Sequence, residues 1–301
     1  MRLVPGIPGP ATLDLHIHSH HSDGAQTPAQ IVSAARAAGL SLISVADHNT
    51  VAAYRELPEL CRQAGLAYIP GVELDCLHRG HSYHLLAYGF DPGDRDFAGL
   101  FANSPGLLDG MSDELIRRLC SEYPQLSPAD YAAFAYDRTR GGWKGLHYLV
   151  ARGVIPCPEA GLPLYGRYGI RYEDCPFPSL QEACAAVHRA GAVAVLAHPG
   201  NWFTADTPDL WALLADFAAA GVDGFECRYP NHSARLTRIL LDFCRERGLY
   251  ATAGGDGHGA FLRVSRGVVY DIGVLGATCA SLGWEEPAAP APCFPCPLYR
   301  G

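Results

Sequence analysis

The sequence contains no apolar run close to the roughly 18 residues expected of a membrane span, so no membrane-embedded segment is predicted. Its first residues, MRLVPGIPGP, lack an apolar segment long enough for a secretory signal. The 11 cysteines are odd in number and irregularly spaced, which favours reduced thiols over a disulfide framework. Together these absences predict a cytoplasmic protein.

An excess of positive charge is also absent, because 31 acidic residues outnumber 23 lysines and arginines and give a net charge of -8. A protein that coats duplex nucleic acid is therefore not expected, although a local basic site for a small anion remains compatible with this charge. Hydrophobic residues make up 49% of the chain and charged residues 18%, which is typical of a globular protein with a large core. The length of 301 residues allows one large domain, or one domain with an insertion.

Strand and helix signals alternate in two parts of the chain, 12–90 and 179–282. Such repeated units predict an α/β fold with a parallel sheet, either open or closed into a barrel. Two of the predicted helices begin with a capping box, Thr27 with Gln30 and Ser179 with Glu182. Strands are expected at 12–17, 41–47, 66–74, 82–90, 192–200, 222–227 and 249–256, and helices at 27–39, 51–64, 179–191, 207–220 and 231–247.

The segment 91–178 interrupts this alternation with short helical pieces that are broken by glycine and proline, which predicts an inserted helical cap. Between Arg138 and Arg171 it has six basic residues and one acidic residue. That reversal of the overall charge is consistent either with binding of an anionic substrate or with a solvated surface. The last residues, 283–301, are rich in proline and alanine and are expected to form a flexible tail.

Polar side chains that commonly bind metals recur at the ends of the predicted strands. The stretch DLHIHSHHSDG, residues 14–24, alone contains four histidines and two aspartates. Residues i and i+2 share one face of a strand, so His16 and His18 can hold one ion, and Asp23 in the following loop can reach a neighbouring ion. The strand ends of a βα barrel converge on the face where chemistry occurs. The candidate ligands at these positions are His16, His18, Asp23, His48, Glu73, His84, His198, Asp256 and His258.

Six histidines with several carboxylates exceed the needs of a single ion. Neutral imidazole and carboxylate oxygen suit Zn, Mn or Fe, and a bridging carboxylate such as Glu73 would let two ions lie close together. We therefore expect more than one divalent metal ion. Asp47 is either a partner that orients His48 or simply a polar strand end.

At these positions the chain resembles the PHP (polymerase and histidinol phosphatase) family of metallophosphoesterases. The resemblance is carried by DLHIHSHHSDG, SVADHNT, GVEL, LAHPG and GGDGHG, which follow in the family's order. It covers about 12–90 and 179–273, and it implies a distorted (β/α)7 barrel with a helical insertion domain. By position in these motifs it also implies three ligand sets, namely His16, His18, Glu73 and Asp256; Glu73, His84 and His198; and Asp23, His48 and His258.

Within the family, the layout is most similar to the bacterial 3′,5′-nucleotide bisphosphate phosphatase type. This resemblance implies a phosphoric ester hydrolase in which a metal-activated hydroxide cleaves phosphate monoesters of nucleotides, 3′,5′-bisphosphates or short 5′-phosphorylated oligonucleotides. The partner would be a small phosphorylated molecule rather than a membrane or duplex nucleic acid. Three alternatives stay open: a histidinol-phosphate-type phosphatase, a hydrolase of a non-phosphate ester or amide, and a non-catalytic nucleotide-binding module. The residues expected to take part in catalysis are Asp23, His48, Glu73, His198 and Asp256.

Three basic residues are candidates for substrate binding. Arg228 follows a predicted strand and can donate two parallel hydrogen bonds to a phosphate, although an ion pair with a carboxylate is the alternative. Lys144 and Arg171 lie in the basic stretch of the insertion. At Arg228 and Tyr229 the chain departs from the Tyr-His pair that relatives commonly have.

Overall fold

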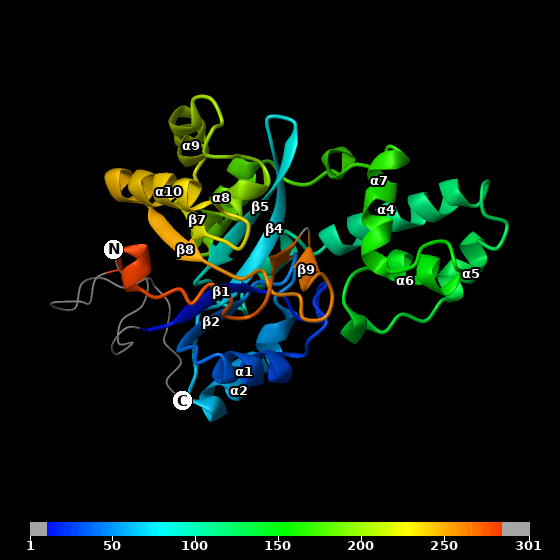
Figure 1. The fold of residues 1–301 in the computed structure, drawn as a ribbon, viewed down its shortest axis with the longest axis horizontal. Coiled ribbons are helices and arrows are strands. Elements are labelled where there is room, and N and C mark those ends of the chain that lie inside the picture. Colours follow the sequence, from blue (N-terminus) through cyan, green and yellow to red (C-terminus); the bar gives the residue numbers. More distant parts are fainter. Residues whose placement is uncertain (1–10, 266, 285–301) are drawn as a thin grey trace.

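The computed structural model describes residues 11–265 and 267–284, which form a mixed α/β fold with a helical region on one side (Figure 1). Two sheets make up its centre, one of three strands and one of five. No helix among the described residues is long and apolar enough to cross a membrane.

The three-stranded sheet is made of the first three strands that the structure describes and is parallel throughout. The capping box of Thr27 and Gln30 begins its first helix, as the sequence predicted. The second predicted helix is instead a 3-10 turn followed by a short α-helix, which begins at Leu57 next to Pro58. The elements are β1 (Leu13–Ile17), α1 (Pro28–Ala37), β2 (Leu42–Val45), η1 (Ala52–Arg55), α2 (Leu57–Ala64) and β3 (Ala67–Tyr68).

The five-stranded sheet has the order β4-β5-β6-β7-β8. The capping box of Ser179 and Glu182 begins α8, again as predicted. The elements are β4 (Gly71–His78), β5 (His81–Tyr88), α8 (Leu180–Arg189), β6 (Val193–Leu196), η5 (Pro199–Asn201), α9 (Leu210–Ala219), β7 (Gly224–Arg228), α10 (Ala234–Arg247), β8 (Tyr250–Ala253), the hairpin β9 (Val264–Ser265) and β10 (Val268–Val269), and η6 (Ala280–Leu282).

The expectation of a parallel sheet is wrong for part of the five-stranded sheet. Strands β6, β7 and β8 are parallel, but β5 is antiparallel to both β4 and β6. The reason is a two-residue turn between β4 and β5, where Arg79 and Gly80 both have positive φ angles of 49° and 81°. Such a turn matches the twist of two antiparallel strands and makes β4 and β5 a hairpin.

The two sheets meet through isolated bridges at the ends of their strands. Ile17 of β1 pairs with Gly257 beyond β8, and His48 beyond β2 pairs with Glu73 of β4. The described strands therefore lie in two adjoining sheets, and the closed (β/α)7 barrel stays a prediction. These bridges bring the end of β1, the end of β2, the beginning of β4 and the end of β8 to one place.

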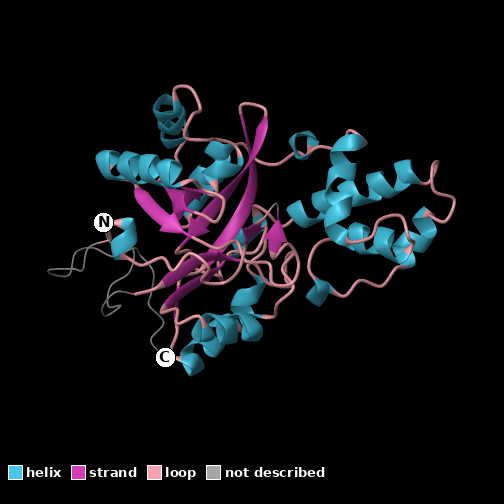
Figure 2. Cartoon of the chain, in the orientation of Figure 1, coloured by secondary structure: helices cyan, strands magenta, loops and turns pink. Residues whose placement is uncertain are grey.

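Between β5 and α8 the described backbone from Asp91 to Pro178 is helical and contains no strand (Figure 2). These helices pack around a hydrophobic core of their own, which includes Leu115, Tyr148 and Leu149. The helices are α3 (Arg95–Gly99), α4 (Ser104–Leu119), α5 (Pro128–Ala133), η2 (Arg138–Arg140), α6 (Lys144–Ala151), η3 (Pro158–Gly161), α7 (Leu162–Arg167) and η4 (Tyr172–Asp174).

At the other end of the described chain, Trp284 is buried, and its indole N–H donates a hydrogen bond to the carbonyl of Ala251 in β8. The second residue of the segment predicted as a tail, 283–301, thus packs against the sheet. The rest of that segment lies outside the described residues.

Candidate metal centre

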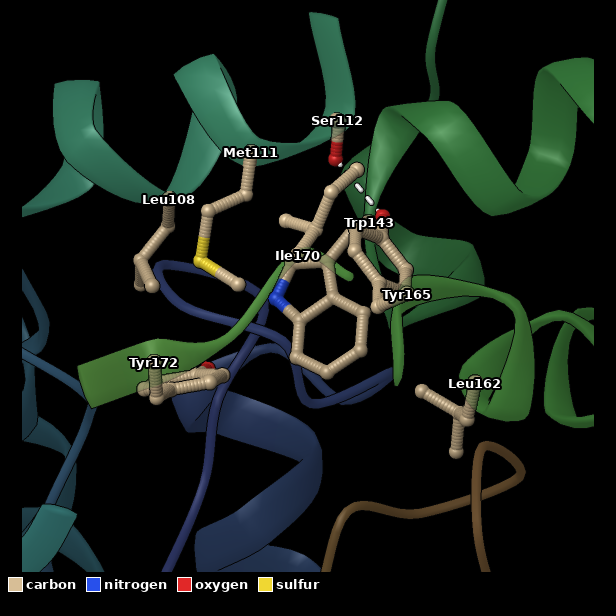
Figure 3. Close-up of a pocket in the computed structure, with 8 residues that line it drawn as sticks. All are labelled: Leu108, Met111, Ser112, Trp143, Leu162, Tyr165, Ile170 and Tyr172. Atoms are coloured by element: carbon tan, nitrogen blue, oxygen red, sulfur yellow. Dashed lines mark hydrogen bonds between the residues drawn. The ribbon is translucent and has the colours of Figure 1, made fainter. Parts of the chain in front are cut away.

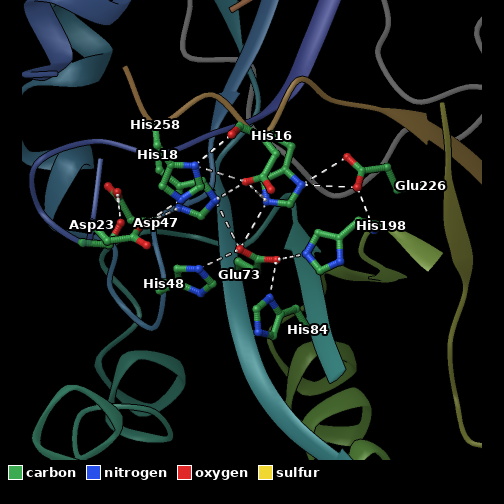
Figure 4. A network of polar contacts seen from close by, with 12 residues as sticks. His16, His18, Asp23, Asp47, His48, Glu73, His84, His198, Glu226 and His258 are labelled. Carbon is green, nitrogen blue, oxygen red and sulfur yellow. Dashed lines mark hydrogen bonds and ion pairs between the residues drawn. The ribbon is translucent and has the colours of Figure 1, made fainter. Parts of the chain in front are cut away.

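The structure brings all nine candidate ligands into one cluster where the two sheets meet (Figure 4). The contributing elements are β1 and the loop after it, the loop after β2, β4, β5, and the loops after β6 and β8. Glu73 lies near the beginning of β4 rather than at a strand end, because β4 runs away from the cluster. His84 lies in the middle of β5, opposite Asp75 of β4.

Glu73 occupies the centre of the cluster and is 1% exposed. Its Oε2 lies 3.2 Å from Nε2 of both His16 and His18 and 3.3 Å from Nε2 of His48. Its other oxygen, Oε1, lies 3.0 Å from Nδ1 of His84 and 2.9 Å from Nε2 of His198. One carboxylate therefore contacts five imidazoles, which is the arrangement of a bridging ligand.

Four groups in the cluster have donor atoms close enough to share one ion. Two of them coincide with sets that the family resemblance implied, and a third adds His18 to the implied set of Asp23, His48 and His258. The fourth was not anticipated and includes Asp75, whose Oδ1 lies 3.3 Å from Nε2 of His84. The four groups are His16, His18, Glu73 and Asp256; Glu73, His84 and His198; His18, Asp23, His48 and His258; and His48, Asp75 and His84.

The residues fit divalent cations. Nε2 of His16, both ring nitrogens of His18 and Nδ1 of His198 are buried without a hydrogen-bond partner. A buried polar atom left unsatisfied costs about 1–3 kcal/mol. Four such nitrogen atoms in one cluster therefore indicate that a binding partner belongs there. Imidazole nitrogen and carboxylate oxygen are the donors that Zn, Mn and Fe accept, and a cation among them would satisfy these atoms.

The charges of the buried carboxylates in the cluster also favour the binding of cations. Burial by itself raises the pKa of Glu73, but the neighbouring His16, His48 and His84 outweigh it and hold that pKa well below its usual range. Burial likewise lowers the pKa of His18, yet the carboxylates of Asp256 and Glu73 raise it to about 10. The carboxylates thus stay ionised and favour positive charge on the imidazoles around them, and a bound metal ion would supply that charge in place of the protons.

Two of the candidate ligands have unusual backbone conformations. The φ angles of His198 and Asp256 are 27° and 50°, in the left-handed region that residues with a Cβ seldom adopt. Asp256 is additionally held by Tyr229, whose hydroxyl donates a 2.7 Å hydrogen bond to Oδ2. Such strain concentrates at functional sites, where the surrounding structure fixes it.

Three buried carboxylates support the ligands, and the sequence interpretation missed two of them. Glu226 in β7 accepts a 2.7 Å hydrogen bond from the backbone N–H of His198 and lies 3.1 Å from Nδ1 of His16. Burial raises the pKa of Asp14 to about 6, although backbone N–H groups of Gly273 and Gly255 oppose that rise. A lone acidic residue inside an apolar strand, as in GFEC, was the available signal for Glu226.

The side chain of Asp47, the third supporting carboxylate, contacts the loop after β1, which neither of the two alternatives for Asp47 anticipated. Its oxygens accept hydrogen bonds from the backbone N–H and hydroxyl of Ser19, at 2.7 and 2.6 Å, and from the hydroxyl of Ser22 at 2.6 Å. Asp47 therefore fixes the loop between His18 and Asp23.

The three predicted substrate-binding residues lie in different surroundings. Arg228 is half-buried at the end of β7, next to Tyr229. Lys144 begins α6, and its ammonium lies 4.8 Å from the ring centre of Tyr131 in α5. Arg171 is exposed and pairs with Asp174 at 2.8 Å. The role of each in binding substrate stays a prediction.

Residues 14–123 match the PHP domain. Over 263 residues the chain is 28% identical to a 3′,5′-nucleoside bisphosphate phosphatase from Chromobacterium violaceum, covering 82% of this chain and 87% of that protein. It is also 28% identical to a 5′-3′ exoribonuclease from Salmonella typhimurium, covering 91% and 94%. A solved structure described as a metal-dependent phosphoesterase from Bifidobacterium adolescentis superposes with a TM-score of 0.70 at 28% identity, covering 88% and 94%.

Residues 14–123 thus match the PHP domain, and the chain as a whole is similar to PHP-type metal-dependent phosphoesterases. Its relatives differ in the size of the molecule named as their substrate, from a nucleoside bisphosphate to RNA.

Proposed function

We propose that this protein hydrolyses phosphate monoesters of nucleotides, either mononucleotides or 3′,5′-bisphosphates, with short 5′-phosphorylated oligonucleotides as a further substrate class. The observation that carries the proposal is the cluster of overlapping ligand groups around Glu73. Two to three divalent ions, Mn, Fe or Zn, would be held by the nine candidate ligands. Bound there, they would acidify a water molecule and neutralise charge on phosphoryl oxygens.

The chain's own residues arrange this chemistry. Glu73 and the histidines around it supply a preorganised binding surface for cations, so little reorganisation is needed during the reaction. The cluster is closed on the side of His16 and His18, whose side chains are fully buried, and more open at His84, where the side chain is 22% exposed. The side chain of Asp256, which contacts His18, is 15% exposed. We infer that the phosphate enters on the more open side, at His84.

The test is phosphate release from a panel of compounds with added Mn(II). The panel contains nucleoside monophosphates, 3′,5′-bisphosphates, short 5′-phosphorylated RNAs and histidinol phosphate, together with carboxylic esters and amides. Selective turnover of one nucleotide class supports the proposal and identifies the substrate. Preference for histidinol phosphate, or turnover of only the esters or amides, contradicts it.

Substitution of both His16 and His18 by alanine is expected to abolish phosphate release and to lower bound metal, since these two side chains serve a common ligand group with Glu73. The measurements are turnover and metal content by mass spectrometry. The matched control is His81→Ala, because His81 is an exposed histidine at the beginning of β5, outside the four ligand groups. Full activity in the double variant would contradict the metal assignment.

A further inference from the structure

A cavity of about 160 Å³ lies within the helical region, between α4, α6, α7 and η4. Figure 3 shows the indole of Trp143 projecting among the side chains that line it. Three of these side chains are aromatic and half-buried, and the others are mainly apolar. The lining residues are Leu108, Met111, Ser112, Trp143, Leu162, Tyr165, Ile170 and Tyr172.

The size and chemistry of the cavity suit one planar ring system. A cavity of about 150 Å³ with apolar walls accommodates a benzene ring. At one end, the hydroxyl groups of Ser112 and Tyr165 are 2.8 Å apart and form a hydrogen bond with each other. Those two groups give a mainly apolar cavity a polar position, where a heteroatom of a ring could bind.

The cavity adjoins the metal centre through two aromatic contacts. The ring of Tyr172 lies 6.4 Å from that of His84, and Glu73 contacts the same histidine. On the other side, Trp143 lies 6.4 Å from Phe261, which lies 6.3 Å from His258. The cavity and the ligand cluster are therefore separated by no more than one aromatic side chain at each of these two places.

The loop that carries Trp143 is fastened to the metal-binding loop. The backbone N–H of Gly142 donates a 2.7 Å hydrogen bond to the carbonyl of Asp23. His147 in α6 lies 2.7 Å from the carbonyl of Gly141 and so holds the loop from the other side. The position of the indole relative to the metal ligands is thus set by backbone contacts rather than by a free side chain.

We propose that this cavity is a nucleobase subsite, in which the base of the substrate stacks on Trp143 while the phosphate lies at the metal centre. The inference rests on the proposed function, because it assigns the base of the same substrate. Stacking on an aromatic side chain tolerates any base, since every base has a π-face. The cavity would then favour nucleotides over phosphate esters that lack a base.

The first test compares kcat/KM for a nucleoside 5′-monophosphate with kcat/KM for ribose 5-phosphate, in the full-length protein with Mn(II). The ratio of the two values is expected to fall roughly 5- to 150-fold in Trp143→Leu, the range for loss of one base-stacking contact. Trp143→Phe keeps a ring and is expected to retain most of the ratio. Trp211→Leu is the matched control, because Trp211 lies 38% exposed on α9 and packs against Phe243.

The second test measures binding without turnover. Calorimetry would use the methylene phosphonate analogues of adenosine 5′-monophosphate and of ribose 5-phosphate, with thermal melting to check that each variant folds. The adenosine analogue is expected to bind more tightly than the ribose analogue in the wild type and in Trp143→Phe, and to lose that advantage in Trp143→Leu.

Two outcomes overturn the subsite: an unchanged selectivity ratio in Trp143→Leu, or equal binding of the two analogues by the wild type. An equal loss of activity towards both phosphates also overturns it, since Trp143 would then act only through the fold. If the wild type binds the adenosine analogue through Trp143 but hydrolyses no phosphate, the subsite stands and the proposed function fails.

Discussion

Substitution of Glu226 by glutamine separates orientation of the metal ligands from ligation itself. Glu226 is fully buried, and its two oxygens serve two groups. Oε1 lies 3.1 Å from Nδ1 of His16, and Oε2 accepts a 2.7 Å hydrogen bond from the backbone N–H of His198. A carboxylate can accept at both positions, so Nδ1 of His16 carries the proton and Nε2 presents its lone pair to the cluster.

A glutamine has one acceptor and one donor at the same positions. If its oxygen faces His198, its NH₂ faces Nδ1 of His16, and the imidazole must move its proton to Nε2, where metal ligation needs a lone pair. If the amide turns around, the NH₂ opposes the backbone N–H of His198. The first arrangement removes the lone pair that metal ligation needs, and the second leaves the backbone N–H of His198 unsatisfied, at a cost of about 1–3 kcal/mol. Loss of such an outer partner typically weakens metal affinity 10- to 100-fold, and that is the expected result.

The assay is metal affinity in competition with a chelator, followed by phosphate release at saturating Mn(II). Glu246→Gln is the control, since Glu246 lies exposed near the end of α10. Weakened metal binding with restored turnover at high Mn(II) agrees with a positioning role for Glu226. Wild-type metal affinity in Glu226→Gln refutes the reasoning.

Burial lowers the pKa of His232 to about 4, from 6.5 in an exposed histidine, so proton uptake favours the unfolded chain between those values. As the pH falls from 7 to 4, the free energy of unfolding of the wild type is expected to fall by roughly 3 kcal/mol more than that of His232→Gln. Urea unfolding measures both values, and an equal pH dependence in the two proteins would contradict the lowered pKa of His232. A second prediction compares Gly142→Ala with the control Gly153→Ala, because both glycines have φ angles near 70°. Only at Gly142 would the added Cβ lie 2.7 Å from the side chain of Phe261. Both should lose about 1–2 kcal/mol of stability, and only Gly142→Ala should also lose phosphate release; equal activities would show that this loop does not position the site.

The sequence predicted local features of the fold well where short-range chemistry decides them. The capping boxes at Thr27 and Ser179 begin helices as expected, because the partners lie three residues apart. The direction of β5 was missed, because it depends on the positive φ angles of Arg79 and Gly80, a turn that was not recognised. The hairpin of β9 and β10 was also missed, since each of its strands has only two residues.

The ligand cluster could be anticipated from motifs, whereas its supporting contacts could not. Histidines and carboxylates after successive strands have a recognisable spacing, so the structure brings together residues that the sequence had already grouped. Asp75 faces His84 only because β4 and β5 form a hairpin, and that turn was not recognised. Glu226 contacts His16 across 210 positions, and only the packing of the two sheets places these two residues side by side.

The two oxygens of Glu73 point to different halves of the molecule. Oε2 contacts histidines that lie in β1 or in the loops after β1 and β2 of the three-stranded sheet. Oε1 contacts histidines that lie in β5 and in the loop after β6 of the five-stranded sheet. The ligand set is therefore complete only while the two sheets are docked. Ions bound to ligands from both sheets would hold the two sheets together. They would stabilise the folded state by mass action, and by more when the ions bind more tightly. The supply of metal would then govern how long the folded chain persists, as well as how fast it works.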